Sequence, residues 1–418
     1  MATDVFVALA EACATGLGAG NVPILAVPHP LGGIDRPAVG AKALAAAAPL
    51  VALLEKPWPR VAAEATDPTS PPSRRLRVER TVSGITDFVA NPPWTDGMPI
   101  VPPTVDLVAG LIAASGRPAG EVVARLAPRF GAATIERIAA NAAMAGCRPE
   151  VMPLLVTAVE AVADPAFNLP GVQATTHPCG VLVLVSGPAA AHAGISGGEG
   201  CLGPGQPGNQ SVGRAMRLIL MNIGGGIPGT TDRSCHGSPA KLAYCLTENL
   251  AGSPWDPFHV EEGWSDHDST VTVLAVEGPH NIQDHFSRTA EGILDTVGAS
   301  LRNVGCNNFA HSIAALRGTI GGEWSPRMVV VFGPEHARTA AATGLGKAAI
   351  RRSLWERATI PWAQVPREWR DGLAPVASVP VARRAEEIVV LVAGGTGKHS
   401  CWMPSMGSTS MVTRPVLG

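Results

Sequence analysis

The sequence predicts an α/β fold: mixed and parallel sheets with flanking helices, in a two-lobed body that follows a small N-terminal α/β fragment. Four continuous apolar runs carry this prediction, because runs of this length are typical of strands buried on both faces. Each run ends in Gly-Pro or Gly-Gly, with a histidine close by. The runs are Val181–Val185, Val271–Val276, Met328–Phe332 and Ile388–Val392.

The order of patterns along the chain predicts four segments. Residues 1–55 form the α/β fragment, and residues 56–78 are a proline-rich linker. Residues 79–270 form a first lobe, helical and then α/β, and residues 271–418 form a second α/β lobe. Within the fragment we expect two helices and a strand, at Val5–Leu17, Pro37–Leu54 and Val22–Val27.

Helix signals place the remaining elements. A short strand is expected at 100–103. Thr104 is a suitable N-cap and Pro149 suits a first turn, which predicts helices at Thr104–Ser115, Thr134–Ala145 and Pro149–Ala163. Helices are also expected after the first and third apolar runs, at Asn209–Met221 and Glu335–Ala342.

Composition excludes some partners and favours others. The chain has 418 residues, a net charge of −2 and 46% hydrophobic residues, so nucleic acid is not an expected partner. Only 16% of residues are charged, which favours oligomerisation. No secretion signal is expected, and the apolar stretch Ala41–Leu54 is shorter than a membrane span and contains Lys42. We therefore expect a cytoplasmic protein without a membrane partner.

Cysteines supply the main chemical signal. The chain has eight, and no Cys-x-x-Cys motif, which argues against a disulfide scaffold or a zinc ribbon. Five lie in short stretches at expected strand ends, where α/β proteins build active sites. They are Cys179, Cys201, Cys235, Cys306 and Cys401.

The leading catalytic candidate is Cys401. Lys398 and His399 precede it, and a cation nearby favours the thiolate, which is the nucleophilic form. His177, Cys179 and His336 are the next candidates, as acid, base or ligand. A buried, inert cysteine in a C-terminal loop is the alternative.

A metal site is the second interpretation. His177-Pro178-Cys179 and His399-Ser400-Cys401 share a spacing that places both side chains on one face of an extended chain. Thiolate with imidazole suits Zn, Cu or Fe. The candidate ligands are His177, Cys179, Cys235, His236, Cys306 and Cys401.

A glycine-rich loop is the candidate substrate site. It contains Gly197, Gly198, Gly203 and Gly205 and leads into a helix with Arg214, a generic anion cradle. The alternative is that its glycines let the loop pass close to another backbone. Asn307 and Asn308 could orient a substrate amide or carboxylate, or only turn the chain.

Several stretches together resemble the UGSC-type family, bacterial α/β proteins named for a selenocysteine- or cysteine-Gly-Ser-Cys motif. Asn21–Gly33 resembles the closing half of that domain, and the rest resembles its larger companion. The matching stretches of the body are 94–103, 141–149, 171–178, 333–337 and 393–400. The resemblance implies that the Cys-Gly-Ser-Cys motif, with the first strand and helix of that domain, should lie upstream of residue 1, and this chain lacks them. It further implies that a UGSC-like partner subunit supplies them or that the present cysteines have taken over.

Taken together, the sequence predicts an enzyme that acts on a small carboxylate- or sulfur-containing metabolite through a cysteine thiolate. One alternative is a lyase, hydratase or oxidoreductase that depends on a Cys/His-bound transition metal. The other is a non-catalytic subunit of a two-component enzyme. All three place the site between the lobes, at the strand ends.

Overall fold

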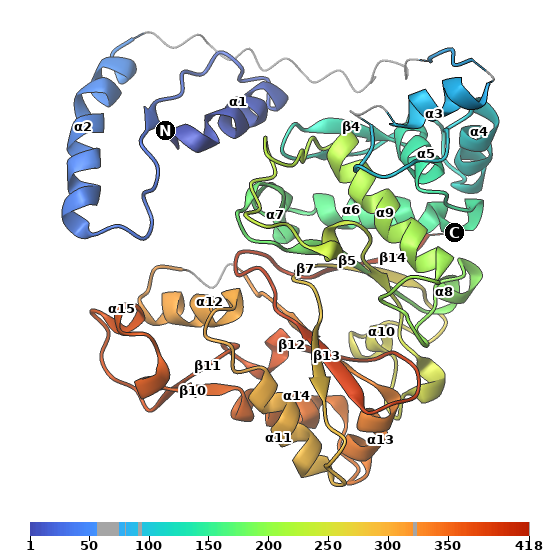
Figure 1. Cartoon of the computed structure of the whole chain (residues 1–418), viewed down its shortest axis with the longest axis vertical. Coiled ribbons are helices and arrows are strands. Elements are labelled where there is room, and N and C mark those ends of the chain that lie inside the picture. The colour runs from blue at the N-terminus through green and yellow to red at the C-terminus, as the bar shows by residue number, and fades with distance from the viewer. Residues whose placement is uncertain (57–74, 80, 91–93, 321–323, 418) are drawn as a thin grey trace.

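The structure is a computed structural model that describes residues 1–56, 75–79, 81–90, 94–320 and 324–417. It confirms the α/β class, with two four-stranded mixed sheets at the centre of the body (Figure 1). In the first sheet the strand order is β14 (Val412–Pro415), β7 (Thr270–Val276), β5 (Gly180–Ser186) and β6 (Cys245–Leu246). In the second it is β12 (Ile388–Val392), β9 (Met328–Phe332), β13 (His399–Met403) and β8 (His280–Gln283).

Each sheet contains one parallel pair, β5 with β6 and β9 with β12, and its other pairs are antiparallel. The register sets Ser186 at the end of β5 opposite Thr270 at the start of β7. In the second sheet Phe332 at the end of β9 lies opposite Ser400. β5 therefore ends in a polar residue and β9 in an aromatic one, next to the loops that follow.

The two sheets pack face to face through one apolar layer. Leu182 and Leu184 of β5 share a buried cluster with Val329 and Val331 of β9 and with Leu391 of β12. The alternate residues of the same strands point away from this layer, because side chains of a strand alternate between faces. They pack in two further clusters against helices on the outer faces.

The outer helices complete a four-layer arrangement, helices–sheet–sheet–helices (Figure 1). Against the first sheet lie α5 (Ile135–Met144), α6 (Met152–Ala163) and α9 (Pro207–Asn222). Against the second lie α11 (Ala290–Ser300), α12 (Asn307–Leu316), α13 (Pro334–Ala341) and α14 (Lys347–Arg357).

Shorter elements fill the connections. The helices are α3 (Val82–Ala90), α4 (Val105–Ala114), α7 (Leu169–Ala174), α8 (Pro188–His192), α10 (Phe258–Glu261) and α15 (Arg367–Arg370). Two antiparallel pairs join β3 (Val122–Leu126) to β4 (Gly131–Thr134) and β10 (Thr359–Pro361) to β11 (Ser378–Pro380).

The N-terminal unit contains α1 (Val7–Gly16), α2 (Arg36–Leu54) and a parallel pair of β1 (Ala2–Thr3) with β2 (Ala26–Val27). Neither helix has a buried residue. Among the described residues α2 alone is long and apolar enough to cross a membrane, a weak criterion that core helices and signal sequences also meet.

The apolar runs became β5, β7, β9 and β12, and the predicted helices formed with Thr104 and Thr134 as N-caps. Two strand predictions were wrong. Residues 100–103 form no strand, and the strand expected over Val22–Val27 is limited to β2.

The expected boundary after residue 270 runs through the first sheet, because β7 and β14 pair there. Most of the expected linker, at 57–74, lies outside the described residues.

Packing against the second sheet predicts a large stability loss for Phe332→Ala. Phe332 is fully buried, and its ring meets that of Trp255 edge-on, 5.9 Å between centroids. We expect the free energy of unfolding, measured by urea denaturation, to fall by about 3–5 kcal/mol. Phe286, 85% exposed, is the matched control, and Phe286→Ala should change it by less than about 0.5 kcal/mol. Equal losses in the two variants would contradict the assigned packing.

Candidate functional site

The loops that follow three strands meet at one edge of the two sheets. The backbone N–H of Asn249, in the loop after β6, donates to the carbonyl of Val392 at the end of β12 (2.8 Å). The Asn249 side chain donates to the carbonyl of Gly394 (2.9 Å), whose own N–H donates to the carbonyl of Gly197 (2.8 Å). We call this meeting point the sheet junction. It lies at the carboxyl ends of β5, β6 and β12.

A buried asparagine holds the glycine-rich loop at the sheet junction. The Asn209 amide accepts from the N–H of Ser196 (2.8 Å) and donates to the carbonyls of Ser196 (2.8 Å) and Cys201 (3.0 Å). Gly197 passes so close to the backbone of Thr247 and Glu248 that a Cβ there would overlap it. Glycine at 197 is therefore required by close approach, the alternative that the sequence had left open.

A cavity of about 280 Å³ lies at the sheet junction. Gly197 and Gly198 line it, together with the end of β5, the loop after β6 and the helix α10. The other lining residues are Ser186, Gly187, Ala190, Ala191, Ile195, Thr247, Glu248, Asn249, Leu250, Ala251, Pro257 and His259. We call this space the junction cavity.

Two side chains of the junction cavity are buried without hydrogen-bond partners. His259 is 1% exposed, and neither ring nitrogen has a partner among the described residues. Ser186 is 4% exposed, and its hydroxyl likewise has none there. Buried polar groups in proteins are nearly always hydrogen-bonded, so each exception requires an explanation.

Glu248, in the cavity wall, belongs to an ion-pair network that includes residues of α14. Lys347, at the start of α14, approaches Glu248 (Nζ–Oε1 3.1 Å) and Glu261 (Nζ–Oε2 3.8 Å). Arg351 pairs with Glu261. The side chains of Lys347 and Glu248 are 4% and 3% exposed. Removing one partner of such a buried pair leaves the other charge buried and unpaired, which is destabilising. Because Lys347 belongs to α14 and Glu248 lines the cavity, the ion pair holds α14 next to the cavity wall.

Cys401 does not have the surroundings expected of a nucleophile. It packs against the apolar layer between the sheets, and burial raises the pKa of its thiol to about 12. His399, two residues earlier, is exposed and bonds to Asn281 (Nδ1–Oδ1 3.1 Å). Lys398 is half-buried, and its ammonium does not lower the pKa of the Cys401 thiol. The thiol is therefore protonated at neutral pH.

His336 has its ring engaged on both sides. Its Nε2 donates to the carbonyl of Asp284 (3.1 Å), so Nδ1 accepts from the Ser400 hydroxyl (2.8 Å). Burial lowers the pKa of His336, which keeps the ring neutral. In this arrangement His336 joins α13 to β13 and β8, and it offers no free nitrogen to a substrate.

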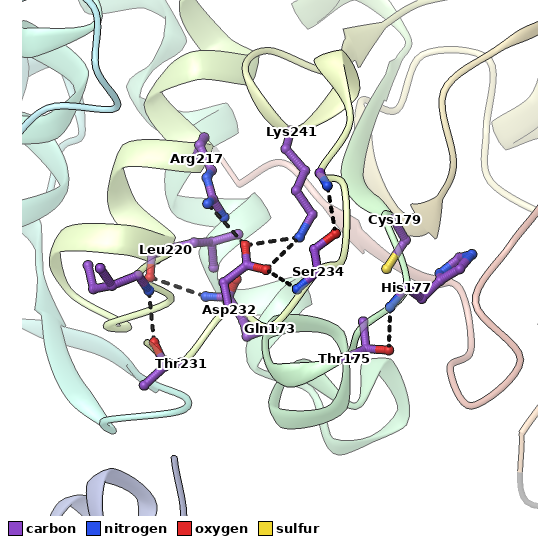
Figure 2. Close-up of polar contacts among 12 residues, drawn as sticks. Gln173, Thr175, His177, Cys179, Arg217, Leu220, Thr231, Asp232, Ser234 and Lys241 are labelled. Carbon is purple, nitrogen blue, oxygen red and sulfur yellow. Dashed lines mark hydrogen bonds and ion pairs between the residues drawn. The ribbon is translucent and has the colours of Figure 1, made fainter. Parts of the chain in front are cut away.

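His177 and Cys179 lie at the start of β5, at the edge opposite the junction cavity (Figure 2). His177 pairs with Glu277 (Nε2–Oε1 2.7 Å). Cys179 is buried against Met406, and burial raises the pKa of its thiol to about 12. The structure therefore separates Cys179 from Cys401, in clusters on opposite faces of the first sheet.

A buried carboxylate lies beside these two residues. Asp232 accepts from Arg217 (3.1 Å) and through both oxygens from Lys241 (2.9 Å each), as Figure 2 shows. A space of about 20 Å³ next to it is lined by Gln173 and Cys179, among others. That is room for roughly one water molecule and too little for a metabolite. The ion pairs of Asp232 with Arg217 and Lys241 therefore have a structural role, in which they hold the loop that carries Asp232.

The remaining predicted substrate residues have structural partners. Arg214 binds both oxygens of Asp96 (2.8 Å each) and also donates to the carbonyl of Pro99 (2.8 Å). Asn308 exchanges two hydrogen bonds with Ser405 (2.8 Å each). Asn307, Gly203 and Gly205 do not line the junction cavity. The anion cradle expected around Arg214 is therefore occupied by a carboxylate of the chain itself.

The six candidate metal ligands are not gathered at one point. Cys306 is buried at the start of α12, and Cys235 and His236 are exposed in the loop before Lys241. Throughout the part of the chain that the structure describes, no group of three or more His, Cys, Asp or Glu side chains could hold a metal ion.

Apart from Gly197 and Gly198, the sequence did not point to the residues that line the junction cavity. Ser186 had a usable signal, since it is the polar end of an apolar run. His259 had none, because it stands alone between Phe258 and Val260. Glu248 and Lys347 are 99 positions apart, and only the packing of the sheets brings them together.

Thiol labelling tests the assigned burial. Cys235 is exposed, whereas the raised pKa values keep the Cys179 and Cys401 thiols protonated at pH 8. We expect iodoacetamide to modify Cys235 first in the folded protein and all eight cysteines only after unfolding in urea, as read by peptide mass spectrometry. Cys235→Ser should remove the fast reaction. Modification of Cys401 as fast as that of Cys235 would contradict the structure.

Comparison of the chain with protein-family models, with curated proteins and with solved structures found no match. The resemblance to the UGSC-type family stays a prediction, and so does a UGSC-like partner subunit. The function is therefore argued from the residues of the junction cavity.

Proposed function

We propose that the chain is an enzyme that binds a small metabolite in the junction cavity and moves a proton through the imidazole of His259. The observation that carries the proposal is the burial of this ring with both nitrogens unpartnered among the described residues. Its position supports the same reading, since ligands of open α/β sheets bind at the carboxyl ends of the strands. The volume of about 280 Å³ is near the lower end of the range for ligand pockets.

The energetic argument starts from the cost of the arrangement. An unsatisfied buried polar group costs about 1–3 kcal/mol, and His259 carries two such nitrogens. A ligand that donates to one nitrogen and accepts from the other recovers this cost on binding. Stabilisation that is gained only when the cavity is filled is typical of a binding or catalytic residue.

The chemistry follows from imidazole itself. A neutral ring has one nitrogen that accepts a proton and one that donates a hydrogen bond, and its ordinary pKa is near neutrality. Because His259 lines the cavity, the proposal requires a bound ligand to come within hydrogen-bond reach of the ring. His259 can then act as the general acid or base of an elimination or hydration, which makes lyase or hydratase the reaction class proposed.

Thiolate chemistry on a small carboxylate- or sulfur-containing metabolite is the second candidate. Cys235 is the thiol that favours it, because it is exposed and its backbone N–H donates to the carbonyl of Thr176 (3.0 Å), beside His177. The metal-dependent enzyme and the non-catalytic subunit are kept as predictions without a supporting contact.

Replacing His259 tests the proposal. We expect His259→Gln to lower kcat by about 10²- to 10⁴-fold, the usual contribution of a general acid or base, on whichever compound of a small-metabolite panel the wild type consumes. His267→Gln, in an exposed loop, is the matched control and should keep full activity. Unchanged turnover in His259→Gln would refute the assignment. Loss of turnover after alkylation of Cys235 alone would favour the second candidate.

A further inference from the structure

Among its described lining residues, the junction cavity has no Asp, Glu, Lys or Arg side chain that is free to pair with a charged ligand. Glu248 is the one charged residue among the described lining residues. Its two carboxylate oxygens are taken by the Lys347 ammonium (3.1 Å) and by the backbone N–H of Phe258 (2.5 Å). Lys347 in turn is shared with Glu261. A ligand carboxylate would therefore be buried beside Glu248 without a cation of its own, which is strongly unfavourable.

The free polar groups of the cavity can act as hydrogen-bond donors and acceptors. They are the Ser186 hydroxyl and the ring nitrogens of His259. The hydroxyl of Thr270, directly across the β5–β7 pair from Ser186, is also buried and has no partner within the described residues, but Thr270 does not line the cavity. Hydroxyl groups of a ligand match such partners, because each hydroxyl can donate one hydrogen bond and also accept hydrogen bonds.

The size of the cavity limits the ligand. Its volume of about 280 Å³ lies just below the usual range for ligand pockets, which favours a small compound. Gly187, Ala190, Ala191 and Ile195 make part of the wall apolar, which suits the carbon skeleton of such a compound.

We infer that the ligand of the junction cavity is a small uncharged compound with several hydroxyl groups, rather than a carboxylate. This inference rests on the proposed function, since it names the substrate class for the same site. An uncharged ligand of this kind takes the place of the anionic ligand that the sequence predicted from the glycine-rich loop and Arg214. Ser186 is then a specificity-determining residue, which selects a hydroxyl-bearing ligand.

Two compounds of equal size test the inference. Erythritol and succinate both have four carbon and four oxygen atoms, but erythritol is neutral and succinate carries two negative charges at pH 7. We expect calorimetric titration of the full chain to detect erythritol and not succinate. Ser186→Ala should weaken erythritol binding about twofold to tenfold, the usual effect of one lost hydrogen bond. Ser300→Ala, in α11 and bonded to the carbonyl of Thr296, is the control and should bind as the wild type does.

The outcomes separate this inference from the proposed function. Succinate bound as tightly as erythritol, or erythritol bound equally well by Ser186→Ala, would overturn the neutral class. So would failure of erythritol to bind. In each case, turnover of another compound that His259→Gln abolishes would leave the proposed function standing. Turnover that is independent of His259 would remove both.

Discussion

The apolar layer between the two sheets is the constraint on which the rest of the structure depends. In this layer, leucines of β5 pack against valines of β9. Burial of such apolar surface is the dominant stabilising effect in folding. Because β6 runs parallel to β5 and β12 runs parallel to β9, the packing brings their loops to one edge. Every contact of the sheet junction follows from this arrangement.

The junction cavity forms where that apolar layer ends. Within the layer, side chains of both sheets fill the space, but β5 ends in the small polar Ser186 and the loops diverge from there. Asn209 and Asn249 hold the loops through their side chains. The Glu248–Lys347 pair fixes the wall. The loops are thus held by groups other than His259, whose ring nitrogens have no partner among the described residues.

Local sequence patterns predicted the strands and helices because their causes are local. Continuous apolar runs became buried strands, and Thr104 capped α4 through its hydroxyl as expected. A site at the strand ends was also predicted and stays a prediction; what the structure shows is that Gly197 and Gly394 meet there. What sequence could not supply was the pairing of the two sheets, since that depends on contacts between residues far apart in the chain.

The same limit explains the cysteines. Cys401 follows His399 at the spacing expected for one face of a strand, and β13 does place both on one face. However, His399 lies at the exposed start of β13, whereas Cys401, two residues further along the strand, packs against the apolar layer. Cysteine is among the most frequently buried residue types, so its position near a strand end is consistent with a packing role. His259 carries no comparable local pattern and is recognised only from its unpartnered ring.

A crystal structure at high resolution tests the central claim most directly. The account predicts an open junction cavity in which ordered water or a bound ligand lies within about 2.7–3.2 Å of a His259 ring nitrogen and of the Ser186 hydroxyl. A closed cavity, with both ring nitrogens of His259 bonded to groups of the protein, would contradict it.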